Sequence, residues 1–138
     1  MERTKPRRSS GSEIQQAVKT RQQILVFTDT SLYALQYLGP PFTYGSAIVS
    51  QNVTIRGPKA AIAFEDNVIW MGTNEFYIYG GTVQKLPCTV RDYVFDDLNE
   101  DQAEKVFAAL NSENSEVWWF YPSANSDSND RYVVYNYL

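Results

Sequence analysis

An internal repeat is the feature that most constrains the fold of this chain. Residues 24–35 (ILVFTDTSLYAL) align without a gap with residues 68–79 (VIWMGTNEFYIY). Apolar residues coincide at both ends, the turn tetrads coincide, and Tyr33 matches Tyr77. Residues 116–137 repeat the pattern with a longer turn. A period of roughly 40–50 residues built from short antiparallel strands is typical of β-propeller blades.

Short strands with regular turns also occur in β-sandwiches and barrels, so these folds remain the alternative. The gapless match favours blades. We therefore expect an all-β chain whose antiparallel sheets are consecutive β-propeller blades. Residues 23–138 are expected to form a partial propeller of about three blade-like repeats.

Runs of apolar and aromatic residues between turn residues predict the individual strands. The expected strands are residues 24–27, 32–37, 52–55, 60–64, 68–71, 76–79, 82–86, 106–110, 116–121 and 131–137. Turns are expected near Asp29-Thr30, Asp66-Asn67, Asn74-Glu75 and Gly80-Gly81, of which the last is a strong hairpin signal. Gly39-Pro40-Pro41 should end the first sheet, because proline cannot donate to a ladder.

One short helical insertion is expected near residues 90–105. Val90, Tyr93, Val94 and Leu98 have the spacing of one helix face. Asn99 is a candidate cap for a second short helix at residues 100–105, with Gln102 in the capping-box position.

The N-terminal segment differs from the body of the chain in charge. Residues 1–21 hold six basic and two acidic residues, whereas residues 22–138 hold six basic and fourteen acidic residues. Residues 1–22 are therefore interpreted as a basic N-terminal arm or linker, in which residues 14–22 form a short helix or lead into the first strand. A solvated terminus is favoured over a nucleic-acid contact, and the acidic body is not typical of a nucleic-acid-binding surface.

The composition excludes several chemistries. The chain has no histidine, which excludes Ser-His, Cys-His and His-metal mechanisms within it. Its single cysteine, Cys88, excludes an internal disulfide and a cysteine-cluster zinc site, and Cys88 has no usual base. No apolar run approaches the length of a membrane span or a signal peptide. We expect no enzyme activity, no cofactor, and no catalytic or metal-binding residues.

Two polar segments have a functional alternative that we weigh against a structural one. The acidic residues Asp96, Asp97, Glu100, Asp101 and Glu104 suit a Ca²⁺ site or acid–base pair, but their alternation with apolar residues favours a solvated helix face. The segment Ser123–Asp130 is rich in Asp, Asn and Ser. It lacks the glycine and closing glutamate of an EF-hand, so a long polar hairpin loop is favoured.

Aromatic residues are abundant on the expected strands. They are Trp70, Tyr77, Tyr79, Trp118, Trp119, Tyr121, Tyr132, Tyr135 and Tyr137. Rings that are exposed stack on sugars or bases, whereas alternation along a strand places about half of them between sheets. Packing in the core is the favoured interpretation, and the exposure of Trp70, Trp118 and Trp119 is the test. Asn52-Val53-Thr54 is a glycosylation sequon only in a secretory context.

Three longer strings carry a family resemblance. Residues 20–45, 55–99 and 115–138, with the motifs VFTDTSLY, WMG…FYIYGG and EVWWFYPSANS…DRYVVYNYL, resemble a tail structural protein of short-tailed bacteriophages. The similarity is to tubular nozzle, or packaged-DNA stabilisation, proteins that extend the portal and adaptor. It covers about residues 14–138.

The resemblance implies a structural role in the virion tail, after synthesis in the host cytoplasm. Copies would form a ring that retains packaged DNA and guides its ejection, with other tail and portal–adaptor proteins as partners. Contact with double-stranded DNA would be transient and non-specific, because an acidic body repels DNA. The alternatives are a glycan- or receptor-binding propeller module and a propeller hydrolase with an acidic dyad.

Propellers need about four to eight blades to close, and three blade-like units are too few. The aromatic segment Tyr132–Leu138 would also leave an open strand edge. We therefore expect a piece of a longer protein, or a protomer that completes its sheets with other chains.

Overall fold

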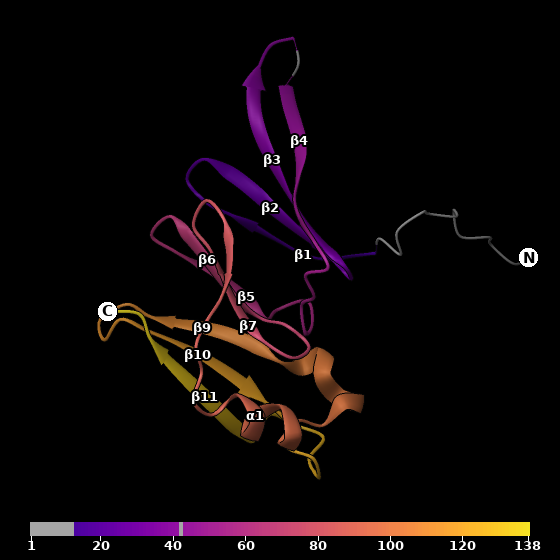
Figure 1. Ribbon diagram of the computed structural model, residues 1–138, viewed down its shortest axis with the longest axis vertical. Helices are drawn as coiled ribbons and strands as arrows, with labels where there is room; N and C mark the ends of the chain where they lie inside the picture. Colours follow the sequence, from indigo (N-terminus) through magenta and orange to yellow (C-terminus); the bar gives the residue numbers. More distant parts are fainter. Residues whose placement is uncertain (1–12, 42) are drawn as a thin grey trace, which may run out of the picture.

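The computed structural model describes residues 13–41 and 43–138, which form three antiparallel β-sheets and two short helices (Figure 1). In each sheet the strands are hydrogen-bonded in the order in which they follow one another along the chain. This arrangement confirms the expected all-β class and the antiparallel pairing. The three sheets are separate and open.

The first two sheets have four strands each. The first contains β1 (Ile14–Lys19), β2 (Gln23–Thr28), β3 (Ser31–Gly39) and β4 (Thr43–Gln51). The second contains β5 (Ala61–Phe64), β6 (Asn67–Met71), β7 (Phe76–Tyr79) and β8 (Val83–Lys85). The third has three strands, which are β9 (Phe107–Asn111), β10 (Glu116–Tyr121) and β11 (Arg131–Asn136).

The sequence repeat occupies the same part of every sheet. Residues 24–35 form the β2–β3 hairpin and residues 68–79 form the β6–β7 hairpin. Residues 116–137 contain β10 and β11. Each repeat therefore supplies the second and third strands of one sheet.

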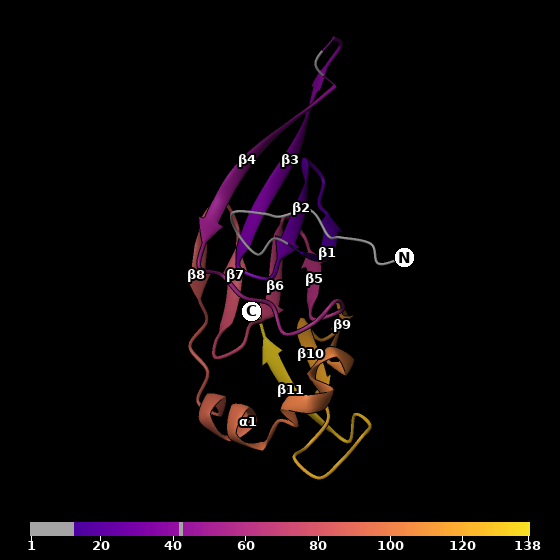
Figure 2. The ribbon, with the colours of Figure 1, turned by 90° about the vertical axis from the view of Figure 1, so that its right-hand side faces the viewer.

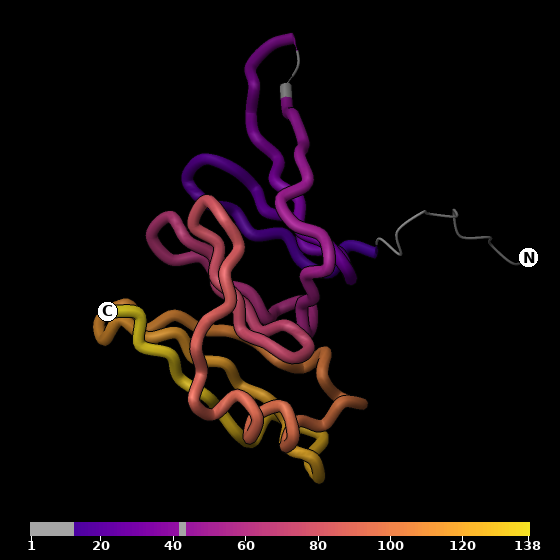
Figure 3. The backbone as a smooth tube through the Cα atoms, in the orientation of Figure 1, coloured from indigo at the N-terminus to yellow at the C-terminus, as the bar shows by residue number. Residues whose placement is uncertain are grey.

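The sheets follow one another as layers in chain order, as the backbone trace shows (Figure 3). Their first strands are neighbours, since β1 contacts β5 and β5 contacts β9. The Gln16 side chain on β1 donates to the Ala61 backbone oxygen at 2.9 Å and accepts from the Ala61 N–H at 3.1 Å. The Ala108 N–H on β9 donates to the Lys59 oxygen at 2.9 Å. Hydrogen bonds thus join all three layers along one side.

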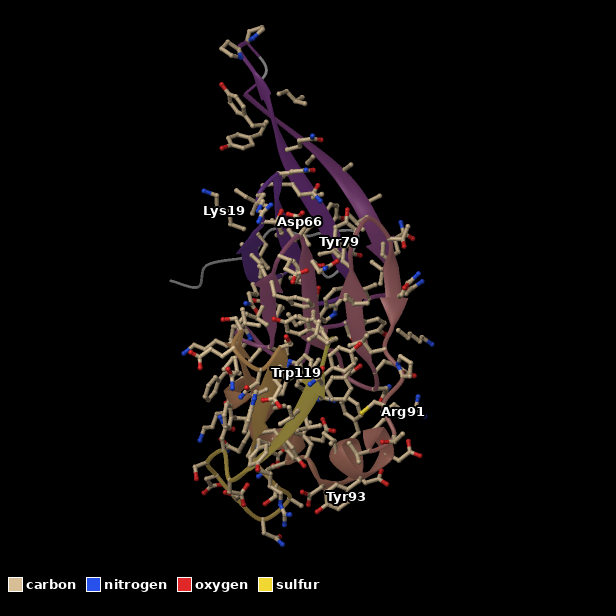
Figure 4. The ribbon with its side chains drawn as sticks, turned by 90° about the vertical axis from the view of Figure 1, so that its left-hand side faces the viewer. Lys19, Asp66, Tyr79, Arg91, Tyr93 and Trp119 are labelled. Carbon is tan, nitrogen blue, oxygen red and sulfur yellow. The ribbon has the colours of Figure 1, made fainter. Side chains whose placement is uncertain are left out.

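Aromatic rings fill the space between the layers. Phe27 of the first sheet meets Trp70 of the second edge to face, with the ring centroids 4.8 Å apart. Phe76 of the second sheet packs against Trp119 of the third at 4.9 Å. Figure 4 shows Trp119 between the second and third sheets. Burial of such rings is the main source of stability for sheets this short.

The expected helical insertion is confirmed, although its buried face is smaller than expected. Helix α1 (Arg91–Asp97) and the 3₁₀-helix η1 (Glu100–Lys105) connect the second and third sheets. Asn99 caps η1, since its side-chain oxygen accepts from the Asp101 N–H at 3.1 Å. Val94 and Leu98 are buried, but Val90 and Tyr93 are exposed. Val90 precedes the helix as its N-cap, and the Tyr93 hydroxyl accepts a hydrogen bond from Arg131 at the surface, at 3.0 Å.

Three details of the predicted strands are wrong. Residues 14–19, which the sequence assigned to the N-terminal arm, form strand β1 and no helix. Residues 1–12 of the arm lie outside the described residues. Residues 52–55 form no strand, because the Val53 N–H donates to Thr30 and the Thr54 oxygen accepts from the Trp70 indole. Strand β4 was not predicted.

The β3–β4 hairpin extends beyond the other strands (Figure 2). Gly39-Pro40-Pro41 ends β3 as expected, but the chain returns as β4 and continues the sheet. Near the tip Tyr37 and Tyr44 pair with their ring centroids 5.5 Å apart. Both rings are exposed, so the hairpin presents an aromatic tip to its surroundings.

Candidate functional site

The acidic residues near the helices do not converge on one point. The Glu100 carboxylate pairs with the largely buried guanidinium of Arg56, at 2.6 Å. Asp97 pairs with Arg131 at 3.2 Å, and Asp96, Asp101 and Glu104 are exposed. Across residues 13–41 and 43–138, no three potential metal ligands gather where they could hold an ion. The ion pairs tie Glu100 to the segment that contains Arg56, and Asp97 to the start of β11 at Arg131.

The polar segment Ser123–Asp130 is a structured hairpin loop, as expected. The Asp130 carboxylate accepts hydrogen bonds from the Ser123 N–H at 2.8 Å and from the Ser123 hydroxyl at 2.7 Å. These bonds favour the charged form and lower the pKa of Asp130, the backbone bond contributing most. Asn99 donates to the Ser126 oxygen and Asn129 to the Lys105 oxygen, which anchors the loop on η1.

Two of the three tryptophans are unavailable for stacking on a ligand. Trp70 and Trp119 are fully buried. The Trp70 indole donates to the Thr54 oxygen at 3.1 Å, and the Trp119 indole donates to the Ala60 oxygen at 2.8 Å. Both rings are part of the core, as favoured from the sequence. Trp118 is only half-buried and belongs to a different surface.

The third sheet carries an apolar surface on the side opposite to Trp119. Strand alternation and the pairing of Phe120 with Phe107 and Tyr132 place these side chains on one face. We call this surface the aromatic face; it consists of Phe107, Ala109, Trp118, Phe120, Tyr132 and Val134. Phe107 stacks on Phe120 at 4.9 Å, and Trp118 meets Tyr132 at 4.7 Å. Phe107 is 38% exposed and Tyr132 is 59% exposed.

The first sheet has an apolar surface at the other end of the stack. Register pairs Ile24 with Leu35, Val26 with Tyr33 and Tyr33 with Ile48. We call Ile24, Val26, Tyr33, Leu35 and Ile48 the first-sheet outer face. The residues at the alternate positions, among them Leu25, Phe27 and Leu32, are buried and face the second sheet. Ile48 is 46% exposed and the other four side chains are half-buried. Both ends of the stack therefore present apolar residues.

Cys88 borders a cavity of about 190 Å³ beside the second and third sheets. Phe76, Trp119 and Tyr135 also line this cavity, and its lining contains no carboxylate or amine. Without a neighbouring base the thiol has no partner that would activate it. The cavity has the character of a packing gap.

The other residues that were considered from the sequence, in the sequon, the Gly80-Gly81 turn and Tyr77, contribute to packing and turns. In the sequon, Val53 is buried and the Thr54 hydroxyl is bonded to the Thr73 hydroxyl at 2.9 Å. Gly80-Gly81 forms the β7–β8 turn, where Gly81 has the positive φ of 109° that suits glycine. Tyr77 stacks on Trp70, and its burial raises the pKa of the Tyr77 hydroxyl.

No protein-family model and no curated protein matches this chain. In the part of the chain that the structure describes, no helix has the length and apolar character required to cross a bilayer.

The strongest candidate site is thus an interaction surface. The two apolar end faces were not predicted from the sequence, although their signal was present. In the strand sequences EVWWFY and ILVF, apolar residues follow one another without polar residues between them, so they point to both sides of the sheet. This pattern is typical of a strand that is covered on both sides. Exposed apolar patches of this kind are typical of interaction surfaces.

Proposed function

We propose that the chain is a structural component of a phage virion tail, of the nozzle type below the portal, and that its three sheets are consecutive blades of a partial β-propeller. The protein works by assembly and carries no catalysis. Its partners are copies of itself in a ring and neighbouring tail or portal–adaptor proteins. The observation that carries the proposal is the succession of three meandering sheets whose first strands lie side by side.

The layer geometry supports the blade interpretation. In a propeller every blade is a meander, and the blades are arranged radially around a channel with their first strands innermost. Here β5 lies beside both β1 and β9. The turns that follow β1, β5 and β9 all lie on the left side of Figure 1, so these three strands run in the same direction. The bridge between Lys59 and Phe107 is likewise parallel.

The phage-tail part of the proposal depends on the family resemblance of residues 14–138. Two properties of the chain agree with it. The body from residue 22 onward has fourteen acidic and six basic residues, which suits a surface past which DNA slides without adhering. The exposed tip of the β3–β4 hairpin and the two apolar end faces offer broad surfaces for protein neighbours.

A glycan- or receptor-binding module is the second candidate, and the aromatic face is the observation in its favour. Trp118 and Tyr132 lie there beside Glu116, a combination of ring and carboxylate that suits sugars. The burial of Trp70 and Trp119 removes the other two rings on which this function depended. A hydrolase has less support, because Asp97 and Glu100 are paired with different arginines.

Complementation tests the proposal in the phage that encodes the chain. A phage lacking the full-length protein is supplied with wild-type or variant copies, and infectious particles and the virion protein content are measured. We expect Asp96→Ala to leave both unchanged, since this carboxylate is exposed and unpaired in the described part of the chain. Tyr77→Ala should abolish incorporation, because it removes the ring that stacks on Trp70.

Two outcomes contradict the proposal. One is a virion that lacks the protein altogether. The other is an Asp96→Ala phage whose particles assemble normally but do not infect, which would indicate a chemical role for the acidic residues.

A further inference from the structure

We propose that a groove between the first and second sheets binds a neutral carbohydrate. The groove lies where the β3–β4 hairpin extends past the turns of the second sheet (Figure 2). We call it the inter-sheet groove; its lining includes Gln22, Gln23, Gln36, Ala47, Asp66 and Tyr79. The inference does not rest on the proposed tail function, because both walls of the groove belong to the first two sheets of this chain.

Unequal strand lengths create the inter-sheet groove. Strands β3 and β4 have nine residues each, whereas β7 has four and β8 has three. Tyr79 is the last residue of β7, and the inner face of the first sheet continues beyond it without a facing strand. On this face Ala34 is buried, but Gln36 and Leu38, which follow at alternate positions, are exposed and line the groove.

Two contacts fix the walls relative to each other. The Gln23 side-chain amide on β2 donates to the Tyr79 hydroxyl on β7 at 3.2 Å. Arg21, in the β1–β2 turn, approaches the carboxylate of Asp66, in the β5–β6 turn, at 3.7 Å, and Figure 4 shows Asp66 and Tyr79 at this end of the second sheet. The Thr20 N–H donates to the Gln23 oxygen at 2.8 Å and closes the β1–β2 turn. The groove is therefore formed without a ligand, as is usual for small-molecule sites.

The groove has two adjoining lobes that share Gln23 and Tyr79. The lobe beside the turns has a volume of about 310 Å³ and is polar, with Gln22 and Asp66 in its lining. The lobe under the hairpin has a volume of about 370 Å³, and Ala47 and other small or apolar residues line it. Small-molecule sites have volumes of roughly 300–1,000 Å³ and combine an apolar lining with a few polar groups.

The polar groups of the groove suit the hydroxyl groups of a sugar. The side-chain amides of Gln22 and Gln36 have no hydrogen-bond partner among the described residues. An amide offers donors and an acceptor in one plane, and the Asp66 carboxylate offers acceptors. Neighbouring sugar hydroxyls each donate and accept, so they match this set. The apolar lobe suits the C–H face of the same ring.

Charge disfavours a nucleotide or another anion in this groove. Among the described residues that line the two lobes, Asp66 alone is charged, and it would repel a phosphate. Lys19 and Arg21 line a separate hollow with Ile24 and Leu35, on the outer side of the first sheet. An extended peptide is disfavoured for a different reason. Its backbone pairs with the edge of a sheet, whereas this groove is bounded by a sheet face and by turns.

Nuclear magnetic resonance of the isotope-labelled full chain tests the inference. The probes are maltose, lactose, cellobiose and diacetylchitobiose, each added up to millimolar concentration, with adenosine monophosphate and triglycine as competing ligand classes. We expect at least one disaccharide to shift, in a saturable way, the side-chain amide signals of Gln22 and Gln36 and the backbone amide signals of Gly80 and Gly81.

Three variants then locate the binding site. Gln36→Ala removes an uncommitted amide, and Tyr79→Phe removes the hydroxyl that Gln23 bonds while it keeps the ring. Each should weaken binding about fivefold, the effect of one hydrogen bond. Gln51→Ala is the matched control, because Gln51 is exposed at the other end of β4 and lies outside the groove lining. Circular dichroism checks the fold, and a loss in either variant with an unchanged control supports the groove.

Any of four results would overturn the inference. They are no binding of any of the four disaccharides, a bound disaccharide that shifts Trp118 and Tyr132 on the aromatic face instead, binding that survives both Gln36→Ala and Tyr79→Phe, and stronger binding of the nucleotide or the peptide in the groove. The proposed function fails separately. A chain that binds no sugar but is present in virions contradicts only the inter-sheet groove, whereas a sugar-binding chain absent from virions contradicts only the tail function.

Discussion

The Trp119 indole of the third sheet donates a 2.8 Å hydrogen bond to the backbone oxygen of Ala60, at the start of the second sheet. The Trp70 indole makes an equivalent bond to Thr54, in the segment that joins the first and second sheets. Each tryptophan thus contributes its ring to a layer contact and its N–H to the chain segment that enters the second sheet. This double role couples packing of the layers to the path of the connecting backbone.

Replacing Trp119 should destabilise the fold much more than replacing its neighbour Trp118. Trp119→Ala removes a fully buried ring and leaves the Ala60 oxygen with only the longer, 3.3 Å bond from the Met71 N–H, so we expect a loss of about 3–5 kcal/mol in the free energy of unfolding. Trp118→Ala removes a half-buried ring from the aromatic face and should cost clearly less. Urea unfolding followed by circular dichroism measures both; equal losses would contradict the different positions of the two rings.

Gly72→Ala should also destabilise the chain. A Cβ atom at this position would lie 2.9 Å from the Thr54 backbone oxygen and 2.7 Å from the Tyr77 ring. The connecting segment and the ring that stacks on Trp70 would both have to move, and overpacking of this kind costs about 1–3 kcal/mol. Thermal unfolding provides the measurement. Gly39→Ala is not a suitable control because its φ of 83° adds strain, so the comparison is Ser46→Ala on the exposed β4 strand.

The carboxyl group of Asp130 should titrate below its ordinary pKa of 3.8, because two Ser123 donors stabilise the charged form. A pKa that is lowered by folding contributes stability above the unfolded-state value, and this stability is lost as pH falls through the folded-state value. Ser123→Ala removes one donor, so it should raise the pKa of Asp130 and reduce stability at neutral pH. The difference from wild type should shrink below about pH 4.

Carbon-detected NMR titration of the carboxyl group measures this directly. Ser128→Ala, at an exposed position in the same loop, serves as the control and should not change the Asp130 pKa. An unchanged pKa in Ser123→Ala would contradict the assigned hydrogen bonds.

The hairpin tip should matter for assembly and not for folding. Tyr37 and Tyr44 are 59% and 54% exposed and pair with each other beyond the rest of the sheet. A Tyr37→Ser, Tyr44→Ser double variant should therefore unfold at nearly the wild-type urea concentration while its incorporation into particles falls. Quantitative mass spectrometry of purified virions gives the second value. Normal incorporation would remove the hairpin tip from the set of assembly surfaces.

The strands of the second sheet were predictable because their sequence carries both strand and turn signals. Alternation in VIWM and FYIY, together with Gly80-Gly81, predicts β6, β7 and the turn to β8. Strand β4 gave no such signal, since Gly45, Ser46 and Ala47 have low strand propensity and are held by pairing with β3. Likewise, β1 contains Gln15 and Gln16, and the Gln16 side chain bonds to the next sheet, which local propensity does not reveal.

The candidate interaction surfaces could be located only with the structure. The sequence shows four consecutive aromatic residues on β10, but only the pairing of Phe120 with Phe107 and Tyr132 shows that four rings share one uncovered face. The acidic residues near the helices were adjacent in sequence, and the structure separates them because Arg56 and Arg131 draw Glu100 and Asp97 apart.

The most direct test of the central claim is a cryo-electron microscopy reconstruction of the tail of the phage that encodes this chain. The account predicts density below the portal into which residues 13–138 fit as three successive layers around a channel, with β1, β5 and β9 nearest the axis. Absence of the chain from the tail, or a fit in which these three strands point away from the axis, would contradict it.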